Sequence, residues 1–262
     1  MSEEENPVSP GLETNEEGLV SGSWLDHLDE LRDRLLKVAI AWIFASAACY
    51  FFSQEIIDFL KEPLARALPA DKQKLYFTNV FETFLVHFKV AAYAGVYVIA
   101  PFVVYQVWAF VAPGLYPKER KLGGPFVVAA TVLFLGGGLF TYSLVFPPAF
   151  EFLMNFGNPE EVTPLITLGE YVSTVIKMIL LFGLAFELPV VIVLLGAIGI
   201  LTSEVLRQKR KHAIVLLCIM SAVLSPPDIL SMGMLMAPMF VFYEASIWII
   251  ALFEKARGKD LS

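Results

Sequence analysis

The chain has 262 residues, of which 57% are hydrophobic and 17% are charged, and its mean hydropathy is +0.66. Soluble proteins usually contain about 45–50% apolar and about 25% charged residues, so this composition excludes an ordinary soluble domain and predicts a membrane protein. The net charge of −7 arises at the N-terminus, because residues 1–30 hold nine acids and no base while the rest of the chain holds 17 acids and 19 bases.

The residue content also argues against several classes of function. The two cysteines lie in apolar runs and the three histidines are far apart, which excludes a disulfide framework and predicts no metal site. No nucleophile–base pattern, phosphate-binding loop or basic stripe is present, so we expect no catalytic residue, no cofactor and no nucleic-acid partner. The acidic N-terminus is unlike a cleavable signal peptide.

The N-terminal part predicts a tail, a surface helix and the start of a membrane domain. Residues 1–22 are rich in Glu, Pro, Gly and Ser and are expected to be disordered. Residues 23–36 begin with a Ser-x-x-Asp start signal and repeat leucine at helical spacing, which predicts an amphipathic helix on the membrane surface. The membrane domain is expected over 37–254, followed by a short cytoplasmic tail over 255–262.

Six apolar segments predict an all-α bundle of six transmembrane helices. They cover residues 38–52, 85–112, 125–146, 171–199, 212–224 and 229–253, and the third helix could begin as early as Pro117. An extramembranous stretch is expected over 54–84. The last two spans are predicted to be short, since span five has thirteen residues and Glu244 interrupts span six. They could instead form one re-entrant hairpin, but the Ser-Pro-Pro-Asp turn at 225–228 favours two spans.

The distribution of lysine and arginine predicts the orientation. Thirteen of these bases lie in four segments, namely the N-terminal segment, the 113–124 and 200–211 loops, and the C-terminal tail. The opposite loops at 147–170 and 225–228 have none. By the positive-inside rule, both termini are predicted to be cytoplasmic.

Three acids stand out as candidate site residues. Glu187 lies within span four, two residues before Pro189, and an ionised carboxylate there costs about 3 kcal/mol on the insertion scale, so it predicts a buried polar site. It could instead be a structural group, neutral or paired with Lys177. Glu30 and Glu119 lie at the predicted cytoplasmic surface, where two carboxylates could each bind a guanidinium.

Both surface acids also have ordinary structural interpretations. Glu30 could form a simple helix ion pair with Arg34, four residues later. Glu119 could stabilise the first turn of a helix that starts at Pro117.

Methionine and glycine clusters predict two further features of the helix surfaces. Four methionines crowd the start of span six, either as lipid-facing filler or as an adaptable surface for partner helices. The triplet at 136–138 is all glycine, which predicts close helix packing in span three.

Five motifs together resemble the TatC family, the polytopic core subunit of the twin-arginine protein translocase. They are HLDELRDRLL (27–36), YQVWAFVAPGLYPKER (105–120), FPPAFEF (146–152), FELPVVIVLL (186–195) and LSPPD (224–228). The resemblance covers residues 23–254. It implies a glove-shaped bundle in the cytoplasmic membrane that binds twin-arginine signal peptides and exports folded proteins on the proton-motive force.

The resemblance also implies roles for individual residues. The signal-peptide site would comprise Glu30, Leu31, Arg32, Phe110, Glu119 and Arg120. Pro63 and Asp228 would be functional positions in the periplasmic loops, and Glu187 would be the intramembrane polar residue. Partner helices would dock near Met232 and Met236, although the family pattern has a polar glutamine where Met232 stands. Expected partners are the single-span subunits TatA and TatB, the precursor proteins, the lipid bilayer and further copies of the chain.

A different class of function also fits the buried acid. A proton-coupled carrier of small solutes could use Glu187 as its proton site. Such carriers commonly contain internal repeats, and we see none in this sequence. The translocase receptor is therefore favoured.

Overall fold

The computed structural model describes residues 16–67, 75–114, 123–155, 165–226 and 228–260. Within these ranges the only β pairing is an isolated parallel bridge between Tyr76 and Thr167, which confirms the all-α prediction. The helices are α1 (Glu16–Tyr50), α2 (Ser53–Ala67), α3 (Val80–Val111), the short η2 (Ala112–Gly114), α5 (Gly123–Phe140), η3 (Thr141–Val145), α6 (Phe146–Asn155), α7 (Leu168–Phe186), α8 (Leu188–Ala197), α9 (Ser203–Gln208), α10 (Arg210–Leu224) and α11 (Ile229–Asp260).

The N-terminal helix has no boundary where the sequence predicted one. α1 runs unbroken through both the expected surface helix at 23–36 and the first apolar segment, because no Gly or Pro interrupts residues 24–50. It also includes residues 16–22 of the expected disordered tail, whereas residues 1–15 lie outside the described part. At the other end, α11 continues into the expected C-terminal tail as far as Asp260.

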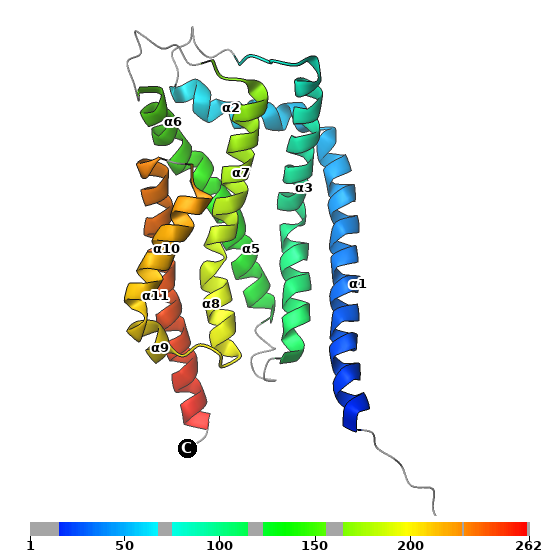
Figure 1. Cartoon of the computed structure of the whole chain (residues 1–262), viewed down its shortest axis with the longest axis vertical. Coiled ribbons are helices and arrows are strands. Elements are labelled where there is room, and N and C mark those ends of the chain that lie inside the picture. The colour runs from blue at the N-terminus through cyan, green and yellow to red at the C-terminus, as the bar shows by residue number, and fades with distance from the viewer. Residues whose placement is uncertain (1–15, 68–74, 115–122, 156–164, 227, 261–262) are drawn as a thin grey trace, which may run out of the picture.

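The chain turns sharply after α1, and α2 crosses one end of the molecule (Figure 1). The two helices meet at an angle of 80°. Ser53 Oγ donates to the carbonyl of Tyr50 at 2.7 Å and lies 2.8 Å from Nδ1 of His87 on α3, which fixes this corner. α2 therefore does not continue the direction of α1, in agreement with a predicted extramembranous stretch.

The third predicted span consists of three consecutive helical pieces. α5 leads through the π-helical turn η3 into α6, and the backbone N–H of Phe146 bonds to Thr141, five residues back. Pro147 and Pro148 follow directly and lack backbone donors, so the regular i→i−4 pattern cannot continue through them. In the glycine triplet, a Cβ on Gly137 would lie 2.8 Å from Cα of Gly183, so this glycine allows α5 and α7 to touch.

The fourth predicted span breaks at Glu187 into α7 and α8. The backbone N–H of Glu187 bonds to Leu184, three residues back, and Pro189 stands in the first turn of α8. The break follows from Pro189, which lacks the donor that would bond to residue 185.

The last two helices differ from the expected pair of short spans. α10 has 15 residues, about 22 Å, but α11 has 32 residues and its apolar stretch Ile229–Lys255 is long enough to cross a membrane. Glu244 does not end the helix, since Arg210 on α10 donates to its Oε2 at 2.8 Å, and the expected short membrane-embedded part of α11 stays a prediction.

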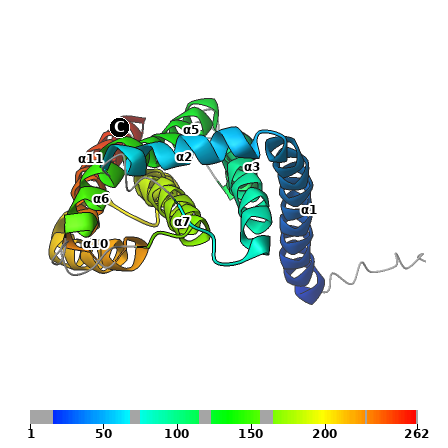
Figure 2. The same cartoon turned by 90° about the horizontal axis from the view of Figure 1, so that it is seen from above.

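Among the described residues, four helical segments are long and apolar enough to span a membrane, and the bent α1–α2 pair would make a fifth if it is one span. The exact count of six spans therefore stays a prediction. The helices stand side by side, with α1 at one edge and α10 and α11 at the other (Figures 1 and 2). The largest core lies between α2, α3, α6, α7 and α11, and Phe146, Phe182 and Leu235 are fully buried in it.

Candidate functional site

Arg34, near the middle of α1, ties this helix to the last part of α3. Its Nε and Nη2 donate to Oε1 of Glu30 at 3.0 and 2.6 Å. Its Nη1 donates to Oε1 of Gln106 at 3.0 Å, and Nη2 also reaches the carbonyl of Ala109 at 3.2 Å. The expected Glu30–Arg34 pair is therefore present, but it also belongs to a contact between two helices.

An aromatic contact completes this cluster. The ring of His27 stacks on Phe110 with centroids 4.3 Å apart and planes at 19°. Nδ1 of His27 lies 3.9 Å from Oε2 of Glu30, and that carboxylate oxygen accepts no hydrogen bond in the described part of the chain. We call Glu30, Arg34, Gln106, His27 and Phe110 the α1–α3 cluster. It offers one free carboxylate oxygen beside an aromatic surface.

The other residues predicted for this site lie elsewhere or outside the described part. Leu31 is exposed, and Arg32 points to its own helix neighbours, Asp29 at 3.4 Å and Asp33 at 3.2 Å. Glu119 and Arg120 fall within residues 115–122, which the structure does not describe. The structure therefore brings together Glu30 and Phe110 from the predicted set. Sequence reasoning missed His27 and Gln106, although a glutamine inside an apolar span was a visible signal.

Pro63 is buried within α2 and leaves the carbonyl of Phe59 without a hydrogen bond inside that helix. A proline at position 63 has no N–H to bond to the carbonyl of Phe59, four residues back. Instead, the hydroxyl of Tyr142 on η3 donates to the Phe59 carbonyl at 2.9 Å, and the hydroxyl of Tyr171 on α7 donates to that of Leu60 at 2.7 Å. These two bonds hold α2 across the bundle.

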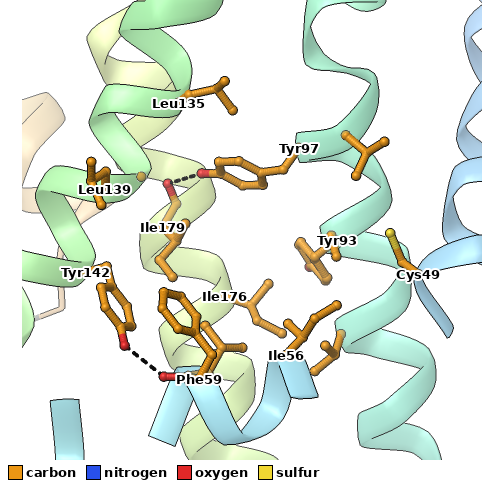
Figure 3. Close-up of a pocket in the computed structure, with 15 residues that line it drawn as sticks. Cys49, Ile56, Phe59, Tyr93, Tyr97, Leu135, Leu139, Tyr142, Ile176 and Ile179 are labelled. Carbon is orange, nitrogen blue, oxygen red and sulfur yellow. Dashed lines mark hydrogen bonds between the residues drawn. The ribbon is translucent and has the colours of Figure 1, made fainter. Parts of the chain in front are cut away.

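Beneath α2, the same tyrosine borders an apolar pocket of about 380 Å³ (Figure 3). Figure 3 shows the Tyr142–Phe59 bond at one side and the bond from Tyr97 to the carbonyl of Ile179, 2.7 Å long, at the other. Oε2 of Glu62 also lies 3.0 Å from the Tyr142 hydroxyl. A hydrogen bond from Arg66 lowers the pKa of Glu62, with a smaller contribution from Tyr142.

Glu187 lines a groove between the α7–α8 break and α10. The groove has a volume of about 760 Å³, and its other charged or titratable lining groups are Lys209, His212 and Tyr243. Oε1 of Glu187 is buried and has no hydrogen-bond partner. The suggested pairing with Lys177 is not formed among the described residues, because ten residues of helix separate the two positions by about 15 Å along the axis.

The residues predicted for the last turn and for partner docking are at or near the start of α11. Oδ1 of Asp228 accepts from the backbone N–H of Ser231 at 2.6 Å, so this acid caps the helix, and its Oδ2 is buried without a partner. Met232 and Met236 are half-buried, whereas Met239 is fully buried in the core. Met234 is half-buried as well, so three of the four methionines keep part of their side chains accessible.

Comparisons with known proteins agree with this architecture. Residues 26–238 match the family of Sec-independent protein translocase protein (TatC). A TatC protein of Halothiobacillus neapolitanus is 40% identical over 89% of this chain, which spans 63% of that relative, and one of Koribacter versatilis is 36% identical over 91% of this chain and 88% of its own length.

Solved structures show the same fold. A crystal structure of the twin-arginine translocase receptor TatC superposes with a TM-score of 0.74 at 31% identity, covering 86% of this chain and 98% of that one. A second structure of the receptor, in the detergent DDM, gives a TM-score of 0.75 at 32% identity over 85% and 98% of the two chains. This chain is a multi-pass membrane protein that belongs to the TatC family.

Proposed function

We propose that this chain is the receptor for twin-arginine signal peptides and the core of a translocase that exports folded proteins across the cytoplasmic membrane on the proton-motive force. The observation that supports it most strongly is the α1–α3 cluster. Its free carboxylate oxygen on Glu30, beside the stacked rings of the exposed His27 and the half-buried Phe110, suits a guanidinium group.

Binding would use two carboxylates for two arginines. Arg34 already occupies Oε1 of Glu30, so an incoming guanidinium would bind mainly through Oε2. Glu119 would bind the second guanidinium. Arg34 would hold Glu30 in place by its bonds to α3, while Leu31, Arg32 and Arg120 would contact neighbouring parts of the signal peptide.

The proposed orientation places the cluster on the cytoplasmic side. The first residues of α1 and α5 and the last residues of α3, α8 and α11 lie at the same end of the molecule (Figure 1). In the sequence, three of the four basic segments adjoin these helix ends and the bases of the N-terminal segment lie within α1, which supports the prediction that both termini are cytoplasmic.

The proposed partners are TatA- and TatB-type single-span subunits, precursor proteins and further copies of this chain. The half-buried Met232 and Met236 would contact a partner helix through adaptable thioether side chains. Pro63, Asp228 and Glu187 would act during transport rather than in signal-peptide binding. Membership of the TatC family favours this function over a solute carrier.

Site-specific crosslinking tests the proposal. A photoreactive residue at Phe110 should crosslink to a twin-arginine precursor in membranes, and replacing both arginines of the precursor by lysines should abolish the product. Phe59, on α2 at the opposite end, provides the matched control position and should give no product. Equal crosslinking at both positions, or none at Phe110, would overturn the proposal.

A further inference from the structure

Two lysines lie within spanning helices and have no acidic partner. Lys89 stands on α3 and Lys177 on α7, and neither forms an ion pair with any residue that the structure describes. Lysine within a membrane span is costly to insert, so such residues usually mark a polar function. Neither lysine belongs to the α1–α3 cluster or to the groove beside Glu187.

Both lysines line one polar groove of about 610 Å³ between α3 and α7. Nζ of Lys89 donates to Oγ of Ser173 at 3.2 Å. Lys177 follows Ser173 by four residues, so it lies on the same face of α7, one turn away. The two ammonium groups therefore face the same space from adjacent helices, with the hydroxyls of Ser173 and Thr174 beside them.

Two glutamates also line the groove, and they differ in their availability. Glu82 is engaged, since it accepts hydrogen bonds from the backbone N–H groups of Thr78 at 2.7 Å and Gly169 at 2.6 Å. Glu170 is exposed and forms no ion pair with the described residues. It lies two turns before Lys177 on the same face of α7, about 10 Å nearer the start of the helix. The groove thus has positive charge deeper in the span and one free negative charge at its outer end.

The depth of the lysines matches that of lipid headgroups. Each lysine lies nine residues after the first residue of its helix, about 13 Å along the axis. α3 is about 48 Å long against a hydrocarbon core of about 30 Å, so the backbone of Lys89 lies about 5 Å inside the core if the helix is centred. A lysine side chain extends far enough to bring its ammonium group to the interface from there.

From this arrangement we propose that the groove binds one phospholipid with an amine-bearing headgroup. The phosphate contacts Lys89, Lys177 and the neighbouring hydroxyls, and the headgroup amine lies farther out, beside Glu170. The order of charges along α7 is the order along such a lipid, whose phosphate adjoins the glycerol and whose amine is outermost.

Native mass spectrometry of the purified full-length chain tests this. Phosphatidylethanolamine, phosphatidylglycerol and diacylglycerol with identical acyl chains are titrated separately into detergent-solubilised protein, with inorganic phosphate as a fourth probe. We expect the protein to retain one phosphatidylethanolamine molecule tightly and phosphatidylglycerol less tightly. Diacylglycerol should not be retained to the same extent, and inorganic phosphate should not displace the bound phospholipid. Loss of one charged hydrogen-bonding partner weakens binding about tenfold or more, so Lys89→Gln and Lys177→Gln should each do so.

Two variants sharpen the test. Glu170→Gln should reduce phosphatidylethanolamine binding to the level of phosphatidylglycerol and leave the latter unchanged. Lys61→Gln is the matched control, because Lys61 lies on α2 at the same end of the molecule and pairs with Asp58 at 3.1 Å. The proposal would be overturned if diacylglycerol were retained equally, if inorganic phosphate displaced the lipid, or if both lysine variants bound it unchanged. Lysine-dependent binding of an acidic partner helix in place of lipid would also overturn it. Signal-peptide binding is measured on the same preparations and tests the proposed receptor function separately, because the lysine groove is not part of the α1–α3 cluster.

Discussion

At the scale of single residues, Glu187 is, after Glu30, the side chain whose surroundings most favour a polar role in transport. It stands at a helix break, one of its oxygens is buried without a partner, and Lys209 and His212 line the same groove. A carboxyl group in that position can make polar contact with a passing chain while leaving the receptor surface untouched.

Substitutions at Glu187 should separate transport from binding. Glu187→Gln keeps the size and polarity and should retain much of the export activity, whereas Glu187→Ala should reduce it several-fold. Glu187→Lys should be worst, because it adds a cation to a groove that already holds Lys209. Export of a folded reporter and signal-peptide binding are measured in the same membranes. Normal export by Glu187→Ala would show that the residue is structural.

At the scale of elements, α2 illustrates how a proline can organise tertiary contacts. Pro63 removes the donor for the Phe59 carbonyl, and Tyr142 supplies it from another helix. The tyrosine bond and the proline are therefore expected to be energetically coupled.

A double-mutant cycle measures that coupling. Tyr142→Phe should cost about 1 kcal/mol of stability in the presence of Pro63, and clearly less in the Pro63→Ala background, where residue 63 can bond to Phe59 itself. Thermal unfolding in detergent gives both values. Tyr105→Phe serves as the control, since Tyr105 is exposed and its hydroxyl forms no hydrogen bond within the described residues. Additive effects of the two substitutions would contradict this explanation of Pro63.

Partner docking belongs to this scale as well. In a background with Cys49 and Cys218 replaced by serine, Met232→Cys should form a disulfide with a cysteine on a partner's single helix. Met232→Gln should be tolerated or should strengthen docking, because it restores the polar group of the family pattern. Disulfide scanning along the partner provides the readout. Crosslinks confined to α3 and α5 would argue against docking on α11.

The sequence predicted the elements well and their junctions less well. Apolar length predicted the four segments of the described chain that are long and apolar enough to cross a membrane, because it depends on local chemistry, and Pro189 accounts for the break at Glu187. The sequence reasoning missed the continuity of α1, which depends on the absence of a helix-breaking Gly or Pro. It also missed the length of α11, where Arg210 reaches Glu244 from another helix. The α1–α3 cluster could be predicted only in part, since the contact of Arg34 with Gln106 joins residues 72 positions apart.

At the scale of the whole molecule, the last residues of α3, α8 and α11 lie at one end and the polar lysine groove lies toward the other (Figure 1). In the sequence, three of the four basic segments lie at or directly after those helix ends. This polarity predicts which side of the membrane each end faces. In the cysteine-free background, Lys255→Cys should react with an impermeant thiol reagent only from the cytoplasmic side, and Leu165→Cys only from the opposite side. Labelling of both positions from one side would contradict the orientation.

The affinity of the purified chain for a twin-arginine signal peptide tests the receptor function most directly. Glu119→Gln should weaken binding roughly 10- to 150-fold, the effect of losing a charged hydrogen-bonding partner. Glu30→Gln should weaken it less, because Arg34 already holds one of its oxygens. Glu62→Gln, on α2 at the other end, should bind like the wild type, and a twin-lysine peptide should bind weakly to all four proteins. Unchanged affinity in both the Glu30 and Glu119 variants would contradict the two-carboxylate receptor.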